Sequence, residues 1–538
     1  MNSNKTQAEN KVHPNRVLRT SLMIFLFLVA AKLMNFFKKI LIGRLFGVSW
    51  VADSFFAASY LPYYLAIFFE GILFLGFLPI FSQVMAEKSR AEADHFVREM
   101  LVAVTLLTGV IAVAACWSAP WVIRELVPGF SADEQKLTSS LFQILSLVVI
   151  FISLSSFFKA LNSYFEHYAY AASSGLVDTA VMIGITLVSW KTWGIFGAAW
   201  GAVAGSLAAF VQQAVYFFKR HSLSLAKPSF RNHGLEKLVW FLVPMGMIWG
   251  LQQIPFLILN RFGSGMWEGT ISSLNISQTL TTVPMGLVSH TVLFAIFPLL
   301  AKQAGDLGGE NLRETFFQTL RGGFLILVPA GFLLTALARP IAALFFTAGD
   351  AGLEGTSRIA NSLACFGWAT FALYADLFMT QSLIAVRKTL PAIFLCGTRA
   401  LLTYFFCYVF TSWWDYQGLA LGFSAGLVVN FFICFPLFFR FSPLVGGWKS
   451  LYGHTAQLAL ASTPVLLTAW WMNRWPIDSW AASSKAVVLA AIGAGFLVGG
   501  GIYLFLCMLL RVKEIHSVFR PLKEGWIQKN WWFASQNE

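Results

Sequence analysis

Charged residues are scarce in this chain. Of its 538 residues only 12% are Asp, Glu, Lys or Arg, whereas 57% are hydrophobic, and the mean hydropathy is +0.67. No polar stretch is long enough to form a soluble domain, since the longest are the two tails and the segment 219–237. This composition excludes a soluble multidomain protein and is typical of a polytopic membrane protein.

Cysteine pairs and catalytic motifs are also lacking. The six cysteines all lie in apolar segments and form no CxxC pair, so we expect neither a disulfide framework nor a zinc site. The sequence has no GxxxxGK[ST], HExxH or GxSxG motif. His290 has no second histidine beside it, so it is interpreted as a packing residue rather than a metal ligand. We therefore expect no enzyme activity, no metal and no cofactor.

Long apolar runs dominate what remains. A membrane-spanning helix needs roughly 20 predominantly apolar residues, and about fourteen runs meet that length. They cover residues 21–46, 54–84, 99–123, 139–163, 171–191, 194–218, 238–260, 270–300, 315–347, 357–386, 390–412, 417–439, 453–473 and 483–510. The predicted fold class is an all-α polytopic membrane protein with about 14 transmembrane helices.

The net charge of +13 is distributed unevenly between alternate loops. If the N-terminus is cytoplasmic, the inside segments carry most of the cations, including Lys88 and Lys227, and the outside loops carry acids such as Asp53 and Glu354. Positively charged loops are retained in the cytoplasm. The basicity therefore predicts a topology with both termini cytoplasmic, and it indicates no nucleic-acid partner.

The chain contains an internal repeat. The pattern Gly197, Gly201, Gly205 recurs as Gly418, Gly422, Gly426, at an offset of 221. The run 77–80, Phe-Leu-Pro-Ile, resembles the run 296–299, Ile-Phe-Pro-Leu, at an offset of 219. Matching offsets predict two six-helix lobes of the same orientation, arranged as a parallel pseudo-two-fold repeat around a central cavity. Prolines such as Pro62 and Pro79 are expected to kink helices facing that cavity.

The predicted organisation follows from the repeat. It comprises a cytoplasmic N-terminal tail (1–20), an N-lobe of helices 1–6 (21–220), a cytoplasmic inter-lobe loop (221–237), a C-lobe of helices 7–12 (238–440), helices 13–14 (441–511) and a cytoplasmic C-terminal tail (512–538).

The first apolar run carries several cations. At 100° per residue, one helical stripe holds the residues Lys32, Asn35, Lys39 and Gly43, whereas Lys38 and Arg44 lie off it. A lysine near a helix end can extend its side chain to the interface, and this explanation suits Arg44 and also Lys38 or Lys39. It suits Lys32 poorly, because apolar sequence flanks Lys32 on both sides. We interpret the stripe as the lining of a polar cavity that receives an anion.

Further ionisable residues lie in other apolar runs: Glu70, Lys159, Asp178, Asp376 and Arg399. An unpaired charge in hydrocarbon is costly, so each needs a partner or water. Asp376 with Arg399, or Glu70 with a lysine of the first run, would form structural pairs. Alternatively, an acid such as Asp178 or Asp376 couples a cation to transport. Lys159 is interpreted as an anchor near the end of its run.

Several spaced motifs carry a family resemblance. They are Phe46-Gly47, Ala52-Asp53-Ser54-Phe55-Phe56, Leu61-Pro62, Phe69-Glu70-Gly71, Phe77-Leu78-Pro79, the runs 119–123 and 128–130, and Val283-Pro284 through Phe297-Pro298. This series resembles the lipid II flippase family (MurJ/MviN). The resemblance implies fourteen helices and a cavity with Lys32, Lys38, Asp53 and Glu70 at family positions. It also places arginines at three positions that here hold Ala66, Ile67 and Thr279.

These observations predict a flippase that moves a lipid-linked diphosphate saccharide, such as lipid II for peptidoglycan synthesis, across the bacterial inner membrane by alternating access. Its expected substrate-binding residues are Lys32, Asn35, Lys38, Lys39, Asp53 and Glu70, with Asp178, Asp376 and Arg399 as ion-coupling or charge-pair residues. We expect a monomer that contacts membrane lipids and is driven by the membrane potential or a monovalent ion. The alternatives are an exopolysaccharide or O-antigen precursor flippase, a small-molecule exporter, and a non-transporting scaffold.

Overall fold

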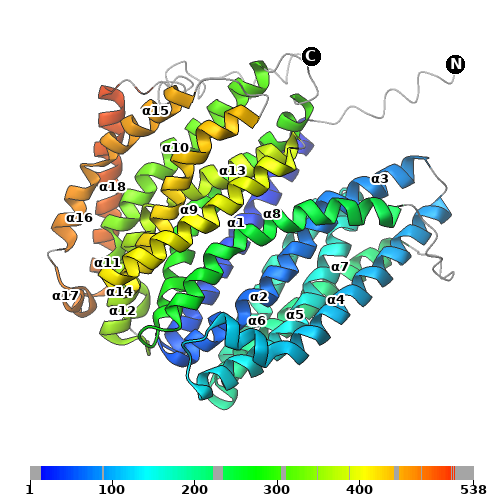
Figure 1. The fold of residues 1–538 in the computed structure, drawn as a ribbon, viewed down its shortest axis with the longest axis horizontal. Coiled ribbons are helices and arrows are strands. Elements are labelled where there is room, and N and C mark those ends of the chain that lie inside the picture. Colours follow the sequence, from blue (N-terminus) through cyan, green and yellow to red (C-terminus); the bar gives the residue numbers. More distant parts are fainter. Residues whose placement is uncertain are drawn as a thin grey trace. The chain divides into compact units, whose positions relative to one another are not determined.

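The structure is a computed structural model that describes residues 14–87, 90–221, 234–303, 310–347, 349–386, 388–441, 448–473 and 475–510, with Val512 and Glu514. Within these residues the chain forms helices and no strand, which confirms the predicted all-α class (Figure 1). Eight of the described helices are long and apolar enough to cross a membrane, or nine spans if the bent pair Gly352–Gly367 and Thr370–Ala385 counts as one. The number of fourteen spans stays a prediction.

The chain divides into two compact units, Met1–Ser272 and Ser273–Glu538. The first unit contains α1 (Pro14–Leu45), α2 (Trp50–Ile72), the π-helix η1 (Leu73–Phe77), α3 (Leu78–Glu87), α4 (Arg90–Leu126), α5 (Ala132–Tyr164), α6 (Tyr168–Trp193), α7 (Ile195–Arg220) and α8 (Gly234–Gly263). The second contains most of α9 (Thr270–Gln303), then α10 (Glu310–Ala336), α11 (Ala338–Phe346), α12 (Gly352–Gly367), α13 (Thr370–Ala385), α14 (Thr389–Phe441), α15 (Trp448–Ser462), α16 (Val465–Asn473), α17 (Ile477–Ala482) and α18 (Lys485–Leu509).

The boundary between the two compact units differs from the boundary between the two copies of the sequence repeat. The repeat assigns α8 to the second lobe, whereas α8 packs on α2 and α4 and belongs to the first unit. Most of the predicted loop 221–237 and of both tails lies outside the described residues, as do Lys88 and Lys227. The division into repeat lobes therefore stays a prediction.

Side-chain caps fix where two helices of the first unit begin. Ser49 precedes α2, and its hydroxyl accepts a hydrogen bond from the Ala52 N–H. Ser131 precedes α5 and forms a capping box with Glu134, in which each side chain accepts a hydrogen bond from the backbone N–H of the other residue. The first N–H groups of a helix lack partners within the helix, so these caps stabilise both starts.

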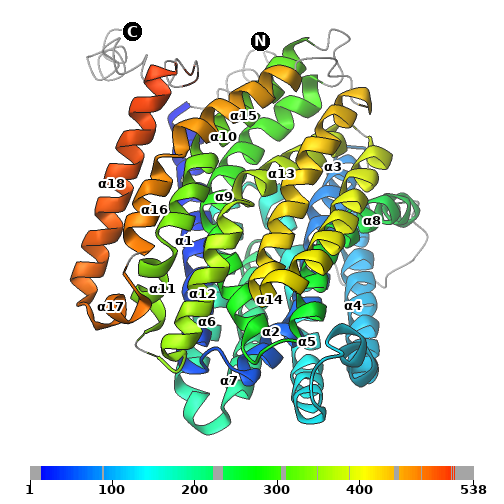
Figure 2. The same ribbon diagram turned by 60° about the vertical axis from the view of Figure 1, so that its left-hand side comes forward.

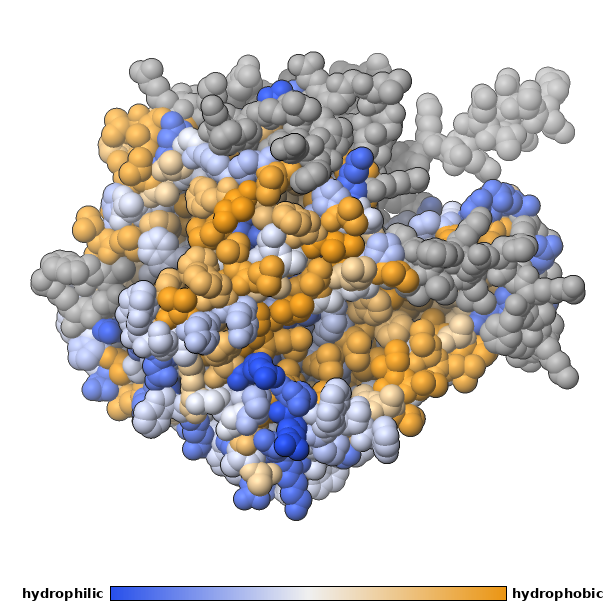
Figure 3. Space-filling model, viewed as in Figure 1, coloured by the Kyte–Doolittle hydropathy of each residue, from blue (hydrophilic) through white to orange (hydrophobic). Residues whose placement is uncertain are grey.

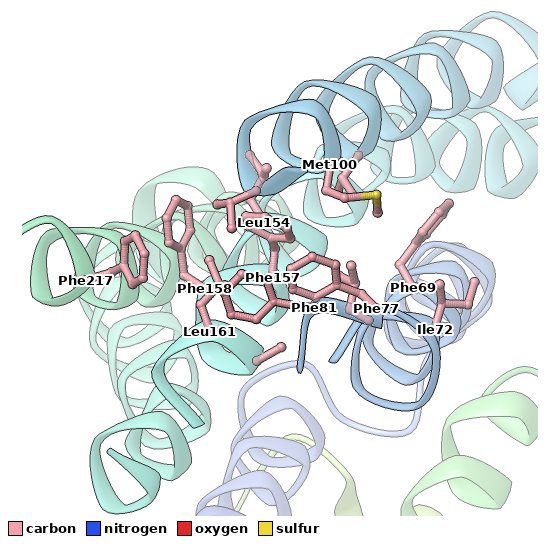
Figure 4. Close-up of a cluster of buried hydrophobic side chains, with 14 of the residues drawn as sticks. Phe69, Ile72, Phe77, Phe81, Met100, Leu154, Phe157, Phe158, Leu161 and Phe217 are labelled. Atoms are coloured by element: carbon pink, nitrogen blue, oxygen red, sulfur yellow. The ribbon is translucent and has the colours of Figure 1, made fainter. Parts of the chain in front are cut away.

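A π-helical turn separates α2 from α3. Pro79 has no N–H and cannot donate a hydrogen bond to the preceding turn of helix, and η1 lies just before it. The ring of Phe77, the last residue of η1, lies in an aromatic core (Figure 4). The centroid of this ring lies 5.6 Å from that of Phe81 and 5.7 Å from that of Phe96, and both pairs are stacked. The prediction of a disrupted helix is confirmed at Pro79, whereas α2 continues through Pro62.

The glycine repeat appears in the local packing of each unit. In the first unit, a β-carbon added to Gly197 would lie 2.2 Å from Ser189 Oγ, because α7 packs closely on α6. In the second, a β-carbon on Gly418 would lie 2.2 Å from the Phe410 carbonyl oxygen, where the two halves of α14 meet. Ser189 and Phe410 are themselves related by the offset of the glycine pattern. Each row of three glycines, 197–205 in α7 and 418–426 in the second half of α14, thus packs on the helix that precedes it in the chain, at equivalent positions of the repeat.

The C-terminal helices pack within the second unit. Helices α15, α16 and α18 lie against α10, and α18 also lies against α11 (Figure 2). The molecular surface bears extensive hydrophobic areas (Figure 3). Trp117 is 88% exposed and Val188 is 84% exposed, as expected for side chains that contact lipid rather than water.

Candidate functional site

Glu70 of α2 and Lys159 of α5 form an ion pair inside the first unit. Lys159 Nζ lies 2.6 Å from Glu70 Oε1, and both side chains are half-buried. The interpretation of Lys159 as an anchor is therefore wrong, because its ammonium group binds a carboxylate of a neighbouring helix. The next residue, Gly71, leaves space for α8, since a β-carbon there would lie 1.3 Å from the Trp249 ring.

Lys32 lies beside this pair. Its side chain on α1 is exposed, as is that of Asn35, and Lys32 is within electrostatic range of both Glu70 and Lys159. A carboxylate shared by two lysines leaves an excess positive charge. Pairing of Glu70 with a lysine of the first run was one of the alternatives that the sequence left open; the structure places Lys32 within electrostatic range of Glu70, but the ion pair is formed by Lys159.

A second group of charges forms further along α1. Lys38 Nζ lies over the ring of Tyr63 of α2, 5.1 Å from its centroid, which is a favourable cation–π geometry. Lys38 is also within electrostatic range of Asp178 of α6. The Tyr63 hydroxyl lies 3.9 Å from the sulfur of Met182, one turn beyond Asp178. Lys38 therefore has an aromatic ring and a carboxylate as neighbours.

The residues of the predicted stripe on α1 differ in how far their side chains are buried. Lys32 and Asn35 are exposed, Lys39 is half-buried within electrostatic range of Lys38, and Gly43 is buried. Exposure therefore decreases along the stripe toward the C-terminal end of α1.

Asp53 has a different role from these lysines. Its side chain is 3% exposed, and its two carboxylate oxygens accept hydrogen bonds from the N–H groups of Gly269 at 2.8 Å and Ser272 at 2.6 Å. These N–H groups belong to the first turn of α9 and the residue before it, where backbone donors lack helical partners. Asp53 therefore caps α9. None of Lys32, Lys38, Lys39 and Lys159, which we call the lysine cluster, is among the groups that act on its carboxylate.

The capping is reciprocal. Glu268 Oε1 accepts a hydrogen bond from the N–H of Trp50, the first residue of α2, at 3.1 Å. Trp50 and Gly269 are related by the same offset of 219 as the proline motifs. Glu268, just before α9, thus caps the start of α2, and Asp53 of α2 caps the start of α9. Gly269 is required here, since its φ is +85° and a β-carbon would lie 2.4 Å from Val48.

Other contacts reinforce this end of the first unit. Arg261 Nη1 donates to the Glu125 carbonyl oxygen at 2.6 Å, and the Gly129 N–H donates to Ser264 Oγ at 3.2 Å. The connections after α1, α4 and α8 are therefore joined by hydrogen bonds and close packing. We refer to this end, defined by Trp50, Asp53, Glu268, Gly269 and Ser272, as the capped end.

The second unit holds a buried ion pair. Arg399 of α14 donates to Asp376 Oδ2 of α13, and both side chains are at most 7% exposed. This pairing was one of the two alternatives that the sequence left open for Asp376. In the described part of the chain, no group of three or more His, Cys, Asp or Glu residues could hold a metal ion.

The three positions where the resemblance implies arginine are structurally distinct. Ala66 is fully buried in α2, Ile67 is 56% exposed, and the Thr279 hydroxyl donates to the Asn275 carbonyl oxygen at 2.8 Å. None of these three side chains carries a charge, so these positions supply no cation.

Sequence reasoning missed Tyr63 and Glu268, and it interpreted Lys159 as an anchor instead of the partner of Glu70. Tyr63 carries no sequence signal, because its contact with Lys38 depends on how α1 and α2 are rotated. Glu268 could have been found from the offset of 219, since it stands at the position equivalent to the cap residue Ser49.

Comparisons with known proteins agree on one family. The model of the family "Lipid II flippase MurJ" matches residues 42–490. A "Probable lipid II flippase MurJ" of Buchnera aphidicola subsp. Schizaphis graminum is 24% identical over 432 residues, covering 78% of this chain and 82% of that protein. The "Lipid II flippase MurJ" of Burkholderia cenocepacia is 22% identical, covering 78% of this chain and 83% of that protein.

Solved structures show the same fold. A structure described as "Lipid II flippase MurJ, inward closed conformation" matches with a TM-score of 0.73 and 19% identity, over 94% of this chain and 99% of that one. An inward-facing multidrug resistance MATE family transporter of the MOP superfamily matches with a TM-score of 0.66 and 15% identity, over 77% of this chain and 95% of that one. Because the family model covers most of the sequence, from residue 42 to residue 490, this chain belongs to the lipid II flippase MurJ family.

Proposed function

We propose that this protein is a flippase that carries a lipid-linked diphosphate saccharide of the lipid II type from the inner to the outer leaflet of the bacterial inner membrane. Family membership supports the substrate class, and the helical fold supports a multi-pass transporter. The lysine cluster of the first unit is the observation that carries the proposal.

The cluster has an excess of positive charge. Lys32, Lys38, Lys39 and Lys159 are accompanied by two acids, Glu70 and Asp178. Cations in a membrane span are costly unless they face water, an acid or an anionic ligand. A diphosphate group supplies the missing negative charge, and the exposed Lys32 and Asn35 are the groups that would meet it first.

The capped end supports alternating access. The hydrogen bonds of Asp53 and Glu268 hold the starts of α2 and α9 together, and Asp53 is one of the acids predicted to lie outside. We infer that the capped end is the outer closure, and that these hydrogen bonds break when the substrate leaves. In this orientation the N-terminal end of α1 is cytoplasmic, and the charge of the loops predicts the same side for the C-terminus.

The energy source is proposed to be electrical. The sequence has no ATP-binding loop, and the membrane potential supplies about 2.3 kcal/mol per charge per 100 mV. An anion leaving the negative interior moves in the favoured direction. We further propose that the protein acts as a monomer without a cofactor.

The test is a flipping assay with fluorescent lipid II in proteoliposomes, normalised to the amount of reconstituted protein. Lys32→Ala should reduce the rate at least tenfold, whereas Arg44→Ala, a loss of a cation at the end of α1, should retain most of the rate. Wild-type flipping by a well-folded Lys32→Ala protein would contradict the role proposed for the lysine cluster, whereas no flipping by the wild-type protein would favour the non-transporting scaffold.

A second candidate is a flippase for a different lipid-linked saccharide, such as an exopolysaccharide or O-antigen precursor. The full burial of Ala66 favours it, because the position that the resemblance assigns to a cation holds a packed methyl group. Lysine binds phosphate as a point charge, without the bidentate geometry of arginine. Faster flipping of a peptide-free lipid-linked oligosaccharide than of lipid II would identify this second function.

A further inference from the structure

Glu70, Asp178 and Asp376 are acids of apolar segments, and they differ in their partners. Glu70 is bound by Lys159, and Asp376 is bound by Arg399. Asp178 forms no hydrogen bond through its side chain and no ion pair with any residue that the structure describes, and its Oδ1 is fully buried. Asp178 is therefore the acid of this set whose charge has no bound cation.

The internal repeat explains this difference. At the offset of 221, Asp178 corresponds to Arg399, and Ser155 of α5 corresponds to Asp376. The second unit thus has an acid and a fixed cation at these two positions, whereas the first unit has a serine and an acid. The first unit therefore has a polar residue at the position of the acid and, among its described residues, no fixed cation to pair with Asp178.

Among the described groups around Asp178, Lys38 is the cation that can move toward it or away from it. On α7, Gly205 faces it, since a β-carbon there would lie 3.0 Å from Asp178 Oδ1. On α1 and α2, the described groups within its electrostatic range are Lys38 and Tyr63. On α5, Lys159 is held by Glu70. The ammonium group of Lys38 is engaged by the Tyr63 ring rather than by a hydrogen bond to Asp178.

We propose that Asp178 is a proton-accepting residue linked to substrate binding through Lys38. When the anionic diphosphate binds, it attracts Lys38, and the Asp178 carboxylate loses its counter-charge in a region of low polarity. A carboxylate in that situation takes up a proton from the aqueous side and becomes a neutral carboxylic acid. When the diphosphate leaves, Lys38 returns and the proton is released. This inference rests on the proposed function and adds a residue to it.

A proton fits this position better than a metal ion. A bound cation such as Ca²⁺ or Mg²⁺ needs six or more oxygen ligands, and a cluster of acidic ligands around Asp178 is absent from the described residues. A proton needs no further ligand. Lys38 acts here as the positioning residue, since it alone of the cluster is in range of both Tyr63 and Asp178.

The experiment is isothermal titration calorimetry of the purified full-length protein in detergent with lipid II, in two buffers of different ionisation enthalpy. The difference between the buffers gives the number of protons taken up on binding. For the wild type we expect a measurable uptake of at most one proton per bound lipid II. The Kd should fall by up to about tenfold when the pH is lowered by one unit, which is the limit for one linked proton. Asp178→Asn should bind with no uptake and with a Kd independent of pH.

Two further variants separate the linkage from folding. Asp133→Asn removes an exposed acid from the first turn of α5 and should keep the wild-type uptake. Lys38→Met should bind more weakly and take up no proton, because Asp178 is then neutral before binding. Binding by the wild type without proton uptake, or an unchanged uptake in Asp178→Asn, would overturn this inference alone. No binding of lipid II by the wild type would contradict the proposed function and the inference together.

Discussion

Gly194 and Asp415 adopt the same backbone conformation at equivalent positions of the sequence repeat. Gly194 has φ +55° and ψ −136°, and Asp415 has φ +50° and ψ −132°. Each residue sits where one long helix ends and the next begins, between α6 and α7 in the first unit and between the two halves of α14 in the second. The repeat therefore extends to a sharp turn that only one of the two copies makes with glycine.

This relationship predicts the effect of substitutions at Gly194. A β-carbon added there meets no atom within 4 Å, so Gly194→Ala tests the backbone alone. We expect a loss of about 1–3 kcal/mol, because a residue with a side chain is strained at this φ. Thermal unfolding in detergent should show a lower Tm. Gly184→Ala, on α6 and equally free of contacts, is the control and should not lower the Tm.

The same relationship predicts that Asp415→Gly is tolerated and Asp415→Val is not. Glycine adopts positive φ without strain, whereas a β-branched residue is a genuine outlier there. The same Tm measurement decides the point. A Tm that is equal for the glycine and valine variants would contradict the assigned conformation.

Opening of the capped end should depend on Asp53. Asp53→Ala leaves the Gly269 and Ser272 N–H groups without their acceptors, at a cost of about 1–3 kcal/mol for each group. We expect the closed state to be depleted, so that Ser54→Cys, at a fully buried neighbouring position, reacts faster with a membrane-impermeant maleimide. The measurement needs a background in which the six native cysteines are replaced.

The control for this experiment is Asp133→Ala, which removes an exposed acid from the first turn of α5. It should leave the labelling rate of Ser54→Cys at the wild-type value. Equal labelling in Asp53→Ala and in the wild type would show that Asp53 does not hold the end closed.

The buried pair of the second unit should be costly to break and inexpensive to replace. Asp376→Asn leaves the Arg399 charge uncompensated, and loss of one partner of such a pair costs about 3–5 kcal/mol. The double variant Asp376→Leu with Arg399→Met should recover most of the loss, because two apolar side chains need no counter-charge. Tm and folded yield in detergent test both statements, and a double variant as unstable as the single one would assign the pair a different role.

The predicted topology has Glu354 outside and Lys227 inside. Single cysteines at these positions, in the cysteine-free background, should be labelled by an impermeant maleimide from the outside at position 354 and only after permeabilisation at position 227. Glu354 is exposed and forms an ion pair with Arg358 one turn later, so labelling there should be unhindered. Strong outside labelling at position 227 would reverse the assigned orientation.

Much of the protein could be predicted from its sequence because the information is local. Apolar runs longer than a membrane is thick leave helices as the structures able to cross it, which fixes the all-α class. The glycine ridges and proline motifs recur at fixed offsets, and the spaced motifs from Phe46 to Pro79 indicate the family. A π-helical turn lies just before Pro79 because proline lacks an N–H wherever it stands.

The partners of the charged residues were decided by the tertiary structure alone. Lys159 binds Glu70 of a helix that is distant in the sequence, Lys38 lies over Tyr63, and Asp178 is left without a bound cation among the described residues. Each outcome depends on how far two helices are rotated and where they cross, and hydrophobic periodicity leaves both within broad limits. A lysine side chain is long enough to reach several acids. The sequence therefore shows which charged residues are present, and the packing of the helices determines which of them form pairs.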